Sequence, residues 1–255
     1  LGIPLLFGAD VIHGMRTVFP IPLGEASSFE PDLARRTARA AAIEATAAGL
    51  HWTFAPTVDV ARDQRWGRVA EAAGEDVFLS CAFSAARVQG FQGDDLKAAD
   101  TLLATPKHFA AYGAVMGGLD YNSVEISEGT LRDVHLPPFK AALDAGALTI
   151  MSAFNDINGV PASANHQLMT VILRHEWKFR GFVVSDYTAD FELVAHGYAS
   201  DDSEATQLAF NAGLDMSMQS GLYGAHLAAL VESVPLAGPA ARKRTGSVAA
   251  HRAGA

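Results

Sequence analysis

The sequence predicts an α/β fold, a TIM-like (β/α)8 barrel in which parallel strands alternate with helices. Six short apolar runs each end in polar or charged residues, and helix-like segments lie between them. Three of these segments close on a glycine directly before the next apolar run, at Gly49, Gly146 and Gly213, as a helix does before a parallel strand. Because nearly every run ends in polar residues, and no G-x-G-x-x-G follows the first, a barrel is favoured over a flat doubly wound sheet.

The six apolar runs are the expected strands of the barrel. They are "IPLLFGAD" (3–10), "HWTFAPTVDV" (51–60), "TLLATPKHF" (101–109), "ALTIMSAFND" (147–156), "GFVVSDY" (181–187) and "GLDMSM" (213–218). Eight strands close such a barrel, so the predicted barrel is incomplete by one or two strands.

The segments between these runs have helical composition and helical end signals. Helices are expected at 30–49, 75–93, 127–146, 165–179 and 202–213. The first has Pro31 in its first turn, and Glu75 with Asp76 opens the second. Asp202 or Ser203 is expected to cap the last helix.

Length and composition predict one globular barrel domain, residues 1–232, in a chain of 255 residues. Residues 233–255 are basic and rich in Ala and Gly, without amphipathic period, and are expected to be a disordered tail. The net charge of −9 argues against nucleic acid and anionic membranes as partners. No apolar stretch is long enough to span a membrane, and no signal-peptide pattern opens the chain.

The single cysteine, Cys81, excludes an internal disulfide and a cysteine-based metal cluster. Its neighbours in "FLSCAF" predict a small buried core residue rather than a nucleophile.

Chemistry-bearing side chains gather at the predicted strand ends. They are Asp10, His13, Asp59, Lys107, His108, Met151, Phe154, Asn155 and Asp186. Each alone could be a cap, a turn residue or half of a surface ion pair, but a core does not need them all together. Carboxylates with Lys, Arg, His and an aromatic side chain such as Trp66 suit a sugar, whose hydroxyls bind charged groups and whose apolar face stacks on a ring.

The chain resembles glycoside hydrolase family 3, most of all its bacterial β-glucosidases of the periplasmic type. The likeness runs from Leu1 to about Leu236 and rests on ordered motifs: "GADVIHG", "APTVDVARDQRWGR", "EAAGED", "KHFAAYGA", "NGVPASANH", "LRHEWKFRGFVVSDY" and "AGLDMSM". It implies an exo-acting, retaining β-glucosidase that removes terminal non-reducing β-D-glucosyl residues from β-glucosides or cello-oligosaccharides. It also implies a periplasmic or secreted location and neither a metal nor an organic cofactor.

Residue roles follow from the same resemblance. It implies that Asp186 is the catalytic nucleophile, that Asp10, Arg68, Lys107 and His108 bind the glycone, and that Met151 and Phe154 pack beside the nucleophile. Tyr187 stands where the family more often has tryptophan or histidine, next to the aglycone. Lys107 and Arg68 are expected to hold Asp186 ionised at neutral pH. Lys178 replaces a family glycine and is expected to be a surface change.

The resemblance also implies parts that this chain lacks. The family carries a strand before "IPLLFGAD" and takes its acid/base glutamate from a second α/β domain after the barrel. No acid/base residue is therefore assigned, and the chain is expected to be truncated at both ends. It is expected to form a homodimer or to associate with the missing C-terminal domain.

Two other functions remain open from the sequence. One is a sugar-phosphate barrel enzyme, for which "QSGLYGAH" (219–226) is a poor phosphate site. The other is a barrel fragment that binds sugar but is catalytically impaired for want of its acid.

Overall fold

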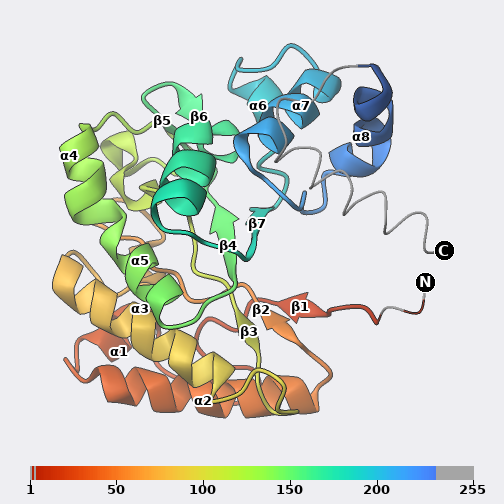
Figure 1. Ribbon diagram of the computed structural model, residues 1–255. Helices are drawn as coiled ribbons and strands as arrows, with labels where there is room; N and C mark the ends of the chain where they lie inside the picture. The colour runs from red at the N-terminus through yellow and green to blue at the C-terminus, as the bar shows by residue number, and fades with distance from the viewer. Residues whose placement is uncertain (1, 3, 234–255) are drawn as a thin grey trace.

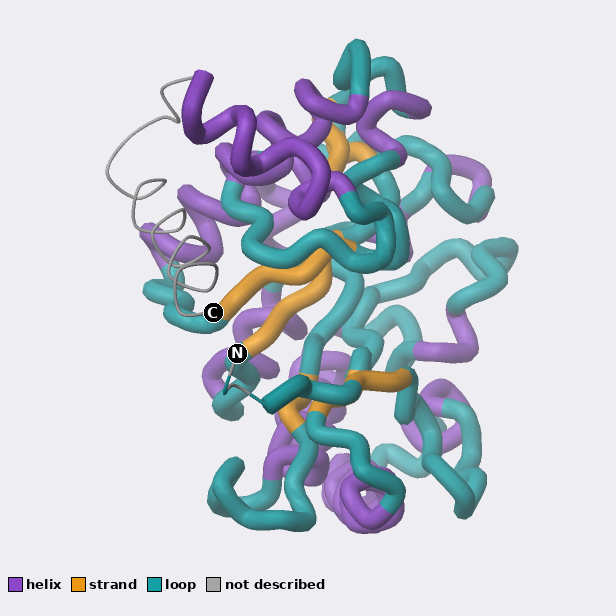
Figure 2. Tube along the Cα trace, turned by 90° about the vertical axis from the view of Figure 1, so that its right-hand side faces the viewer, coloured by secondary structure: helices purple, strands orange, loops and turns teal. Residues whose placement is uncertain are grey.

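The computed structural model describes residue 2 and residues 4–233 of the chain. They contain two parallel sheets: β1 (Gly8–Ala9), β2 (Trp52–Thr53) and β3 (Leu103–Ala104) form one, and β4 (Thr149–Ser152) and β7 (Phe182–Ser185) form the other (Figure 1). Strand β2 pairs with β1 and β3, and β4 pairs in register with β7 along its full length. The two longest strands, β4 and β7, run side by side in Figure 2.

Isolated parallel bridges connect these pieces into one series. Phe109 bridges to Ser152, which joins the segment after β3 to β4, and Val184 bridges to Met216, which adds the sixth predicted run. The spatial order of the six segments is therefore their order in the chain, as in a parallel barrel. The prediction of an incomplete α/β barrel with six recognisable strands is confirmed, although most strands are only two residues long.

A short antiparallel pair was not predicted. Strands β5 (Asp156–Ile157) and β6 (Val160–Pro161) are joined by Asn158 and Gly159, which both have positive φ angles. An Asn-Gly pair in this conformation is the common two-residue hairpin turn.

The longest helices confirm their expected positions. Helix α2 (Pro31–Ala47) packs on α3 (Val77–Gln92), and α3 packs on α5 (Pro137–Asp144), on the lower left of Figure 1. Asp76 caps α3 by accepting the N–H of Leu79 at 2.7 Å. Cys81 of this helix is partly exposed, so the prediction of a buried core position was wrong.

Two other helices differ from the prediction. The segment 127–146 is broken into α4 (Glu128–Thr130), a π-helical turn (Leu131–His135) and α5, because two prolines open α5 and proline lacks an N–H. Helix α7 (Asp202–Ala212) is capped by Asp201, which accepts the Glu204 N–H at 2.9 Å, instead of by Asp202 or Ser203.

The remaining helical segments complete the described chain. They are α1 (Pro22–Ala26), α6 (Glu192–Ala195), α8 (Leu222–Ser233), a π-helix (Gln167–Glu176), and 3-10 turns at Val69–Glu71, Tyr112–Ala114, Met116–Gly118 and Ala162–Ala164. Within the described residues, no helix is both long and apolar enough to cross a membrane. Of the predicted tail, residues 233–255, all but Ser233 lies outside the described residues.

The main core lies where the sheet meets its covering helices. Both faces of β4 and most of β7 are buried, as expected for parallel strands covered by helices. Phe109 packs edge-on against Phe139 of α5 with ring centroids 5.1 Å apart, and Ile150 and Val183 are fully buried beside them. This core holds the ends of β3, β4 and β7 in place, and these are the ends that carry Lys107, Phe154 and Asp186.

Lys178 supports a stability prediction. It is exposed and has a φ of +60°, in the left-handed region that costs an L-residue about 1–2 kcal/mol. Lys178→Gly should raise the free energy of unfolding by about 0.5–1 kcal/mol, because glycine removes that penalty but adds freedom to the unfolded chain. Urea unfolding of the two proteins measures this change in the free energy of unfolding. Lys140→Gly, inside α5, is the matched control and should destabilise by about 1 kcal/mol; equal effects would contradict the argument.

Candidate active site

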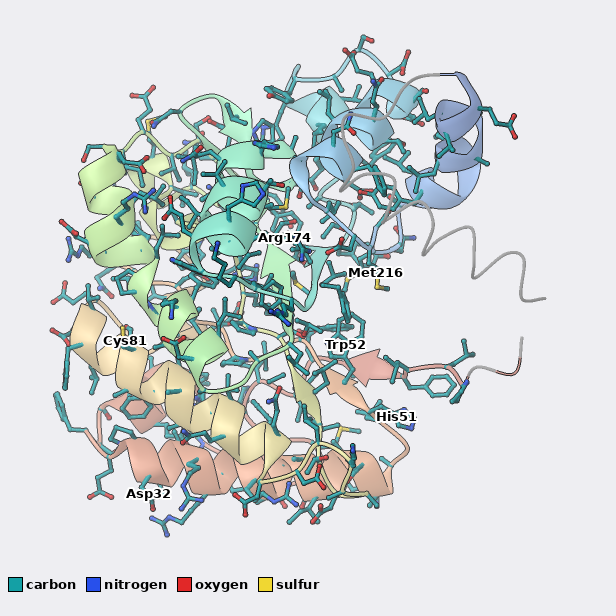
Figure 3. All side chains as sticks on the ribbon, viewed as in Figure 1. Asp32, His51, Trp52, Cys81, Arg174 and Met216 are labelled. Atoms are coloured by element: carbon teal, nitrogen blue, oxygen red, sulfur yellow. The ribbon has the colours of Figure 1, made fainter. Side chains whose placement is uncertain are left out.

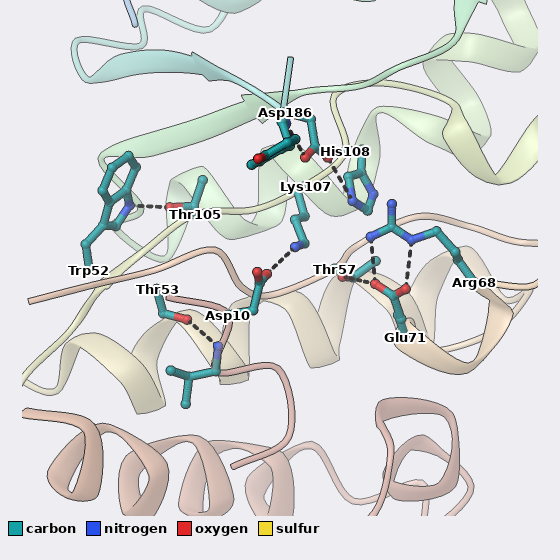
Figure 4. Close-up of polar contacts among 12 residues, drawn as sticks. Asp10, Trp52, Thr53, Thr57, Arg68, Glu71, Thr105, Lys107, His108 and Asp186 are labelled. Atoms are coloured by element: carbon teal, nitrogen blue, oxygen red, sulfur yellow. Dashed lines mark hydrogen bonds and ion pairs between the residues drawn. The ribbon is translucent and has the colours of Figure 1, made fainter. Parts of the chain in front are cut away.

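Asp186 follows β7 directly and lies in a polar cluster with Lys107 and His108 (Figure 4). Its residue is 9% exposed, and its Oδ1 accepts the N–H of Tyr187 at 2.7 Å. Burial raises the pKa of Asp186 above its ordinary value, and this effect outweighs the opposing charges of Lys107 and Arg68. Lys107 and Arg68 therefore act in the expected direction, since both charges lower the pKa of Asp186, but burial of the carboxyl has the larger effect.

His108 lies between two carboxylates. Its Nδ1 is 2.7 Å from Oδ2 of Asp59, and its Nε2 is 3.4 Å from Oδ2 of Asp186. The imidazole is fully buried, and Asp59 follows the β2 segment and is only 2% exposed. Burial raises the pKa of Asp59 to about 7, and burial with the charges of Arg68 and Lys107 lowers the pKa of His108 well below its usual value.

Lys107 and Asp10 form an ion pair across the ends of β3 and β1. Lys107 Nζ is 2.6 Å from Asp10 Oδ1, and the lysine side chain is 6% exposed whereas the aspartate side chain is 58% exposed. The buried cation is thus held between two carboxylates, Asp10 in contact and Asp186 close enough to be stabilised by its charge. Asp10 remains accessible to a ligand.

Arg68 reaches the same cluster from the loop before the 3-10 turn Val69–Glu71. Its guanidinium makes a two-point contact with Glu71, at 2.7 and 2.8 Å, and lies over the ring of Tyr112 with 5.5 Å to the centroid. Two-point contacts of this kind fix the plane of a guanidinium. Glu71 therefore orients the cation that faces Asp59 and Asp186.

Aromatic side chains form one wall of the site. Phe154, 6% exposed, packs on Tyr121 with ring centroids 4.7 Å apart and on Tyr112 at 5.7 Å. Tyr121 and Tyr187 are 51% and 57% exposed, so both offer ring surface to a ligand. Met151 is 1% exposed and packs with Trp52 and Val184 in the core instead of at the surface.

Trp66 does not offer a stacking face. It is 1% exposed, packs edge-on against Tyr112, and donates its indole N–H to Asp120 at 2.9 Å. The suggestion that Trp66 stacks on a sugar ring was therefore wrong. Asn155 is also fully buried, and its amide donates to the carbonyl of Ala110 at 3.3 Å.

A hollow of about 370 Å³ opens beside this cluster. Asp10 and Glu71 line it together with Ile12, His13 and Ile21. Its volume falls within the range of small-molecule sites. Among the described residues, no group of three or more His, Cys, Asp or Glu side chains is placed to hold a metal ion.

The structure thus brings seven of the eight predicted site residues into one cluster, in which His108 is fully buried and Asp10 and Tyr187 are exposed, and Met151 packs in the adjoining core. From the sequence, Asp59 is expected at a strand end but has no assigned role, and Glu71 has none either. Glu192, on α6, was missed altogether: burial and the charge of Asp186 raise its pKa to about 7. Its position six residues after Asp186 was the available signal.

Comparisons with known proteins agree with this fold. A periplasmic β-glucosidase of Salmonella typhimurium is 47% identical over 233 residues, covering 91% of this chain and 30% of that protein. A putative β-xylosidase of Formosa agariphila is 38% identical, covering 92% and 32%. The crystal structure of a β-glucosidase from Listeria innocua in complex with glucose superposes with a TM-score of 0.89 at 46% identity, covering 91% and 32%.

The chain spans about a third of the length of the relatives it matches. The family model for the glycosyl hydrolase family 3 N-terminal domain matches residues 1–246. With relatives well above 30% identity along nearly the whole chain, this protein belongs to glycosyl hydrolase family 3.

Proposed function

We propose that this chain carries the nucleophile and glycone subsite of a retaining, exo-acting β-glucosidase, built on a barrel domain of residues 1–232. The observation that carries the proposal is the carboxylate of Asp186, held at a buried strand end between Lys107, Arg68 and His108. In a retaining reaction a carboxylate oxygen of Asp186 attacks the anomeric carbon as the bond to the leaving-group oxygen breaks. Water later attacks the same carbon and releases Asp186 from the glycosyl-aspartate.

Each neighbour has a role in this proposal. Asp10, half exposed beside the hollow, accepts hydrogen bonds from glycone hydroxyls, and Lys107 and Arg68 supply charged donors. Phe154 packs beside the nucleophile, and the exposed ring of Tyr187 meets the aglycone. The acid/base carboxylate that protonates the leaving group is supplied by polypeptide outside these matched motifs.

Two substrates test the function. The acidic phenol of an activated aryl β-glucoside can leave without being protonated, whereas the glucose that leaves from cellobiose must be protonated by an acid. The proposal expects release of the phenol with retained configuration in the first sugar product, and much slower cellobiose cleavage. Faster turnover of the matching β-xyloside would move the specificity toward the xylosidase relatives. Binding of glucose without phenol release would support an impaired sugar-binding barrel, and turnover of a sugar phosphate would support the isomerase-like alternative.

Replacing Lys107 should change both rate and pH dependence. Lys107→Met keeps the apolar stem but removes a charged donor, which should lower kcat/KM for the aryl glucoside about 100-fold. Because the lysine charge lowers the pKa of Asp186, its loss raises that pKa further, and the acid limb of the pH profile should move to higher pH. Lys140→Met, in an exposed pair with Asp144, should change neither. An unmoved acid limb in Lys107→Met would contradict the site.

We propose that the open ends of the sheet are covered by association. Among the described residues β1 pairs only with β2, and Leu5, Leu6 and Phe7 before it are more than half exposed. Met216, labelled in Figure 3, is 41% exposed on the same side as Trp52, which is itself buried. A homodimer, or contact with a further domain, would bury this apolar surface. Light scattering should give a mass above 26.9 kDa; a fully active monomer of that mass would contradict association.

A periplasmic or secreted location is part of the same proposal. It is supported by the identity to the Salmonella protein, which is named for that compartment. Fractionation of cells that express the natural gene tests it.

A further inference from the structure

The contacts of Asp59 go beyond a simple buried ion pair. Oδ2 of Asp59 lies 2.7 Å from Nδ1 of His108 and also accepts the backbone N–H of His108 at 3.1 Å. The two acceptor contacts point to the same oxygen. Because Oδ2 of Asp59 accepts the backbone N–H of His108, it is an acceptor. The shared proton of the 2.7 Å contact is therefore carried by Nδ1 of the imidazole.

The other ring nitrogen faces the reacting carboxylate. With Nδ1 protonated and the imidazole neutral, Nε2 carries a lone pair, and it lies 3.4 Å from Oδ2 of Asp186. In solution a neutral histidine more often carries its proton on Nε2. That tautomer would instead point a donor at Asp186 and stabilise its charge.

We infer that Asp59 is a positioning residue that holds His108 in the Nδ1–H tautomer, so that an acceptor instead of a donor faces Asp186. Without a proton on Nε2, His108 cannot donate a hydrogen bond to the carboxylate of Asp186. Asp186 therefore stays a stronger nucleophile than it would be with a donor at that distance. In hydrolytic triads a buried carboxylate likewise fixes the tautomer and the orientation of an imidazole.

Other groups around His108 act in the same direction. Lys107 is its chain neighbour, Arg68 approaches from the loop after β2, and the Tyr112 ring packs edge-on with centroids 5.2 Å apart. Both cations disfavour a second proton on the imidazole, and the complete burial of the ring does so as well. Asp59 and Asp186 are the two carboxylates that face it, one at each ring nitrogen.

Nitrogen-15 spectra of histidine-labelled protein test the tautomer directly. They are recorded at about pH 8.5, above the pKa of Asp59, where the pair holds a single proton. The His108 signals are identified by their loss in His108→Gln. The wild type should show a protonated Nδ1 and an unprotonated Nε2. A protonated Nε2 would overturn the inference.

Two variants show whether Asp59 sets the tautomer of His108 or only stabilises the fold. Asp59→Asn can place its amide oxygen where Oδ2 lies, accept both N–H groups, and keep the Nδ1–H tautomer. Asp59→Ala removes the acceptor, and His108 should then change to the Nε2–H form. Asp156→Asn, another buried aspartate away from His108, is the control and should leave the tautomer unchanged. An Asp59→Ala protein that keeps the wild-type tautomer would also overturn the inference.

The kinetic consequence rests on the proposed glucosidase function, whereas the spectra do not. With a donor facing Asp186, the pKa of Asp186 falls, so Asp59→Ala should move the acid limb of aryl glucoside hydrolysis to lower pH and reduce kcat/KM at least about tenfold. Asp59→Asn should keep most of the activity. A purely structural role would lower stability and leave the acid limb where it is. The wild-type spectrum decides the tautomer even if Asp59→Ala does not fold.

Discussion

Replacing Asp186 with asparagine should lower the hydrolysis of an activated aryl β-glucoside by about 10³-fold or more. The amide is nearly the same size as the carboxylate but has no negative oxygen to attack the anomeric carbon. Its neighbours Tyr187, Lys107 and Arg68 remain in place, and the amide oxygen can still accept the N–H of Tyr187, so the fold should be kept. Initial rates with circular dichroism as a check on folding measure the effect.

Chemical trapping tests the same residue without relying on a rate. A 2-fluoro-glucoside with a good leaving group should leave one sugar on Asp186, found by mass spectrometry of the peptide that contains β7. Asp156→Asn should be labelled like the wild type, because Asp156 lies in the β5 hairpin and accepts the N–H of Gly159. A label on Glu192, the other carboxylate whose pKa is raised beside Asp186, would reassign the nucleophile.

The barrel could be predicted because its signals are local. An apolar run followed by polar residues marks the end of a strand, and Gly49, Gly146 and Gly213 do have positive φ angles where helices end. Breaks within helices were less visible. The prolines of 137–138 were present in the sequence, but helical composition on both sides suggested one continuous helix.

The meeting of Asp10, Lys107, His108 and Asp186 could be predicted for a geometric reason: ends of neighbouring parallel strands converge on one rim. The directions in which the side chains point could not be predicted from the sequence. Trp66 has the right chemistry for stacking but turns inward to Asp120, and this depends on the packing of a loop. The pairing of Asp59 with His108 depends on the same kind of detail, since it joins residues 49 positions apart through one oxygen.

Beneath the Asp10 loop lies a second buried ion pair, which should dominate the stability of this part of the fold. Arg87 of α3 pairs with Glu25 of α1, and their side chains are 7% and 1% exposed. Arg87 also donates to the carbonyl of Ile12 at 3.0 Å, two residues after Asp10. Glu25 in turn accepts the hydroxyl of Thr37 from α2. The pair therefore connects three helices to the loop that carries a proposed glycone ligand.

Arg87→Leu should lower the free energy of unfolding by about 3–5 kcal/mol, because it leaves the carboxylate of Glu25 buried without its cation. Denaturant unfolding measures the loss. Arg35→Leu, which breaks an exposed pair with Asp32, is the matched control and should cost no more than about 1 kcal/mol.

The double variant Glu25→Leu with Arg87→Leu separates the two possible causes of that loss. If the cost comes from the uncompensated charge, removing both partners should recover a large part of it, since two apolar side chains can share a buried space at little cost. If the cost comes from the lost contact to Ile12, the double variant should be as unstable as Arg87→Leu alone. Recovery of stability without recovery of aryl glucoside hydrolysis would show that Arg87, through Ile12, also places Asp10.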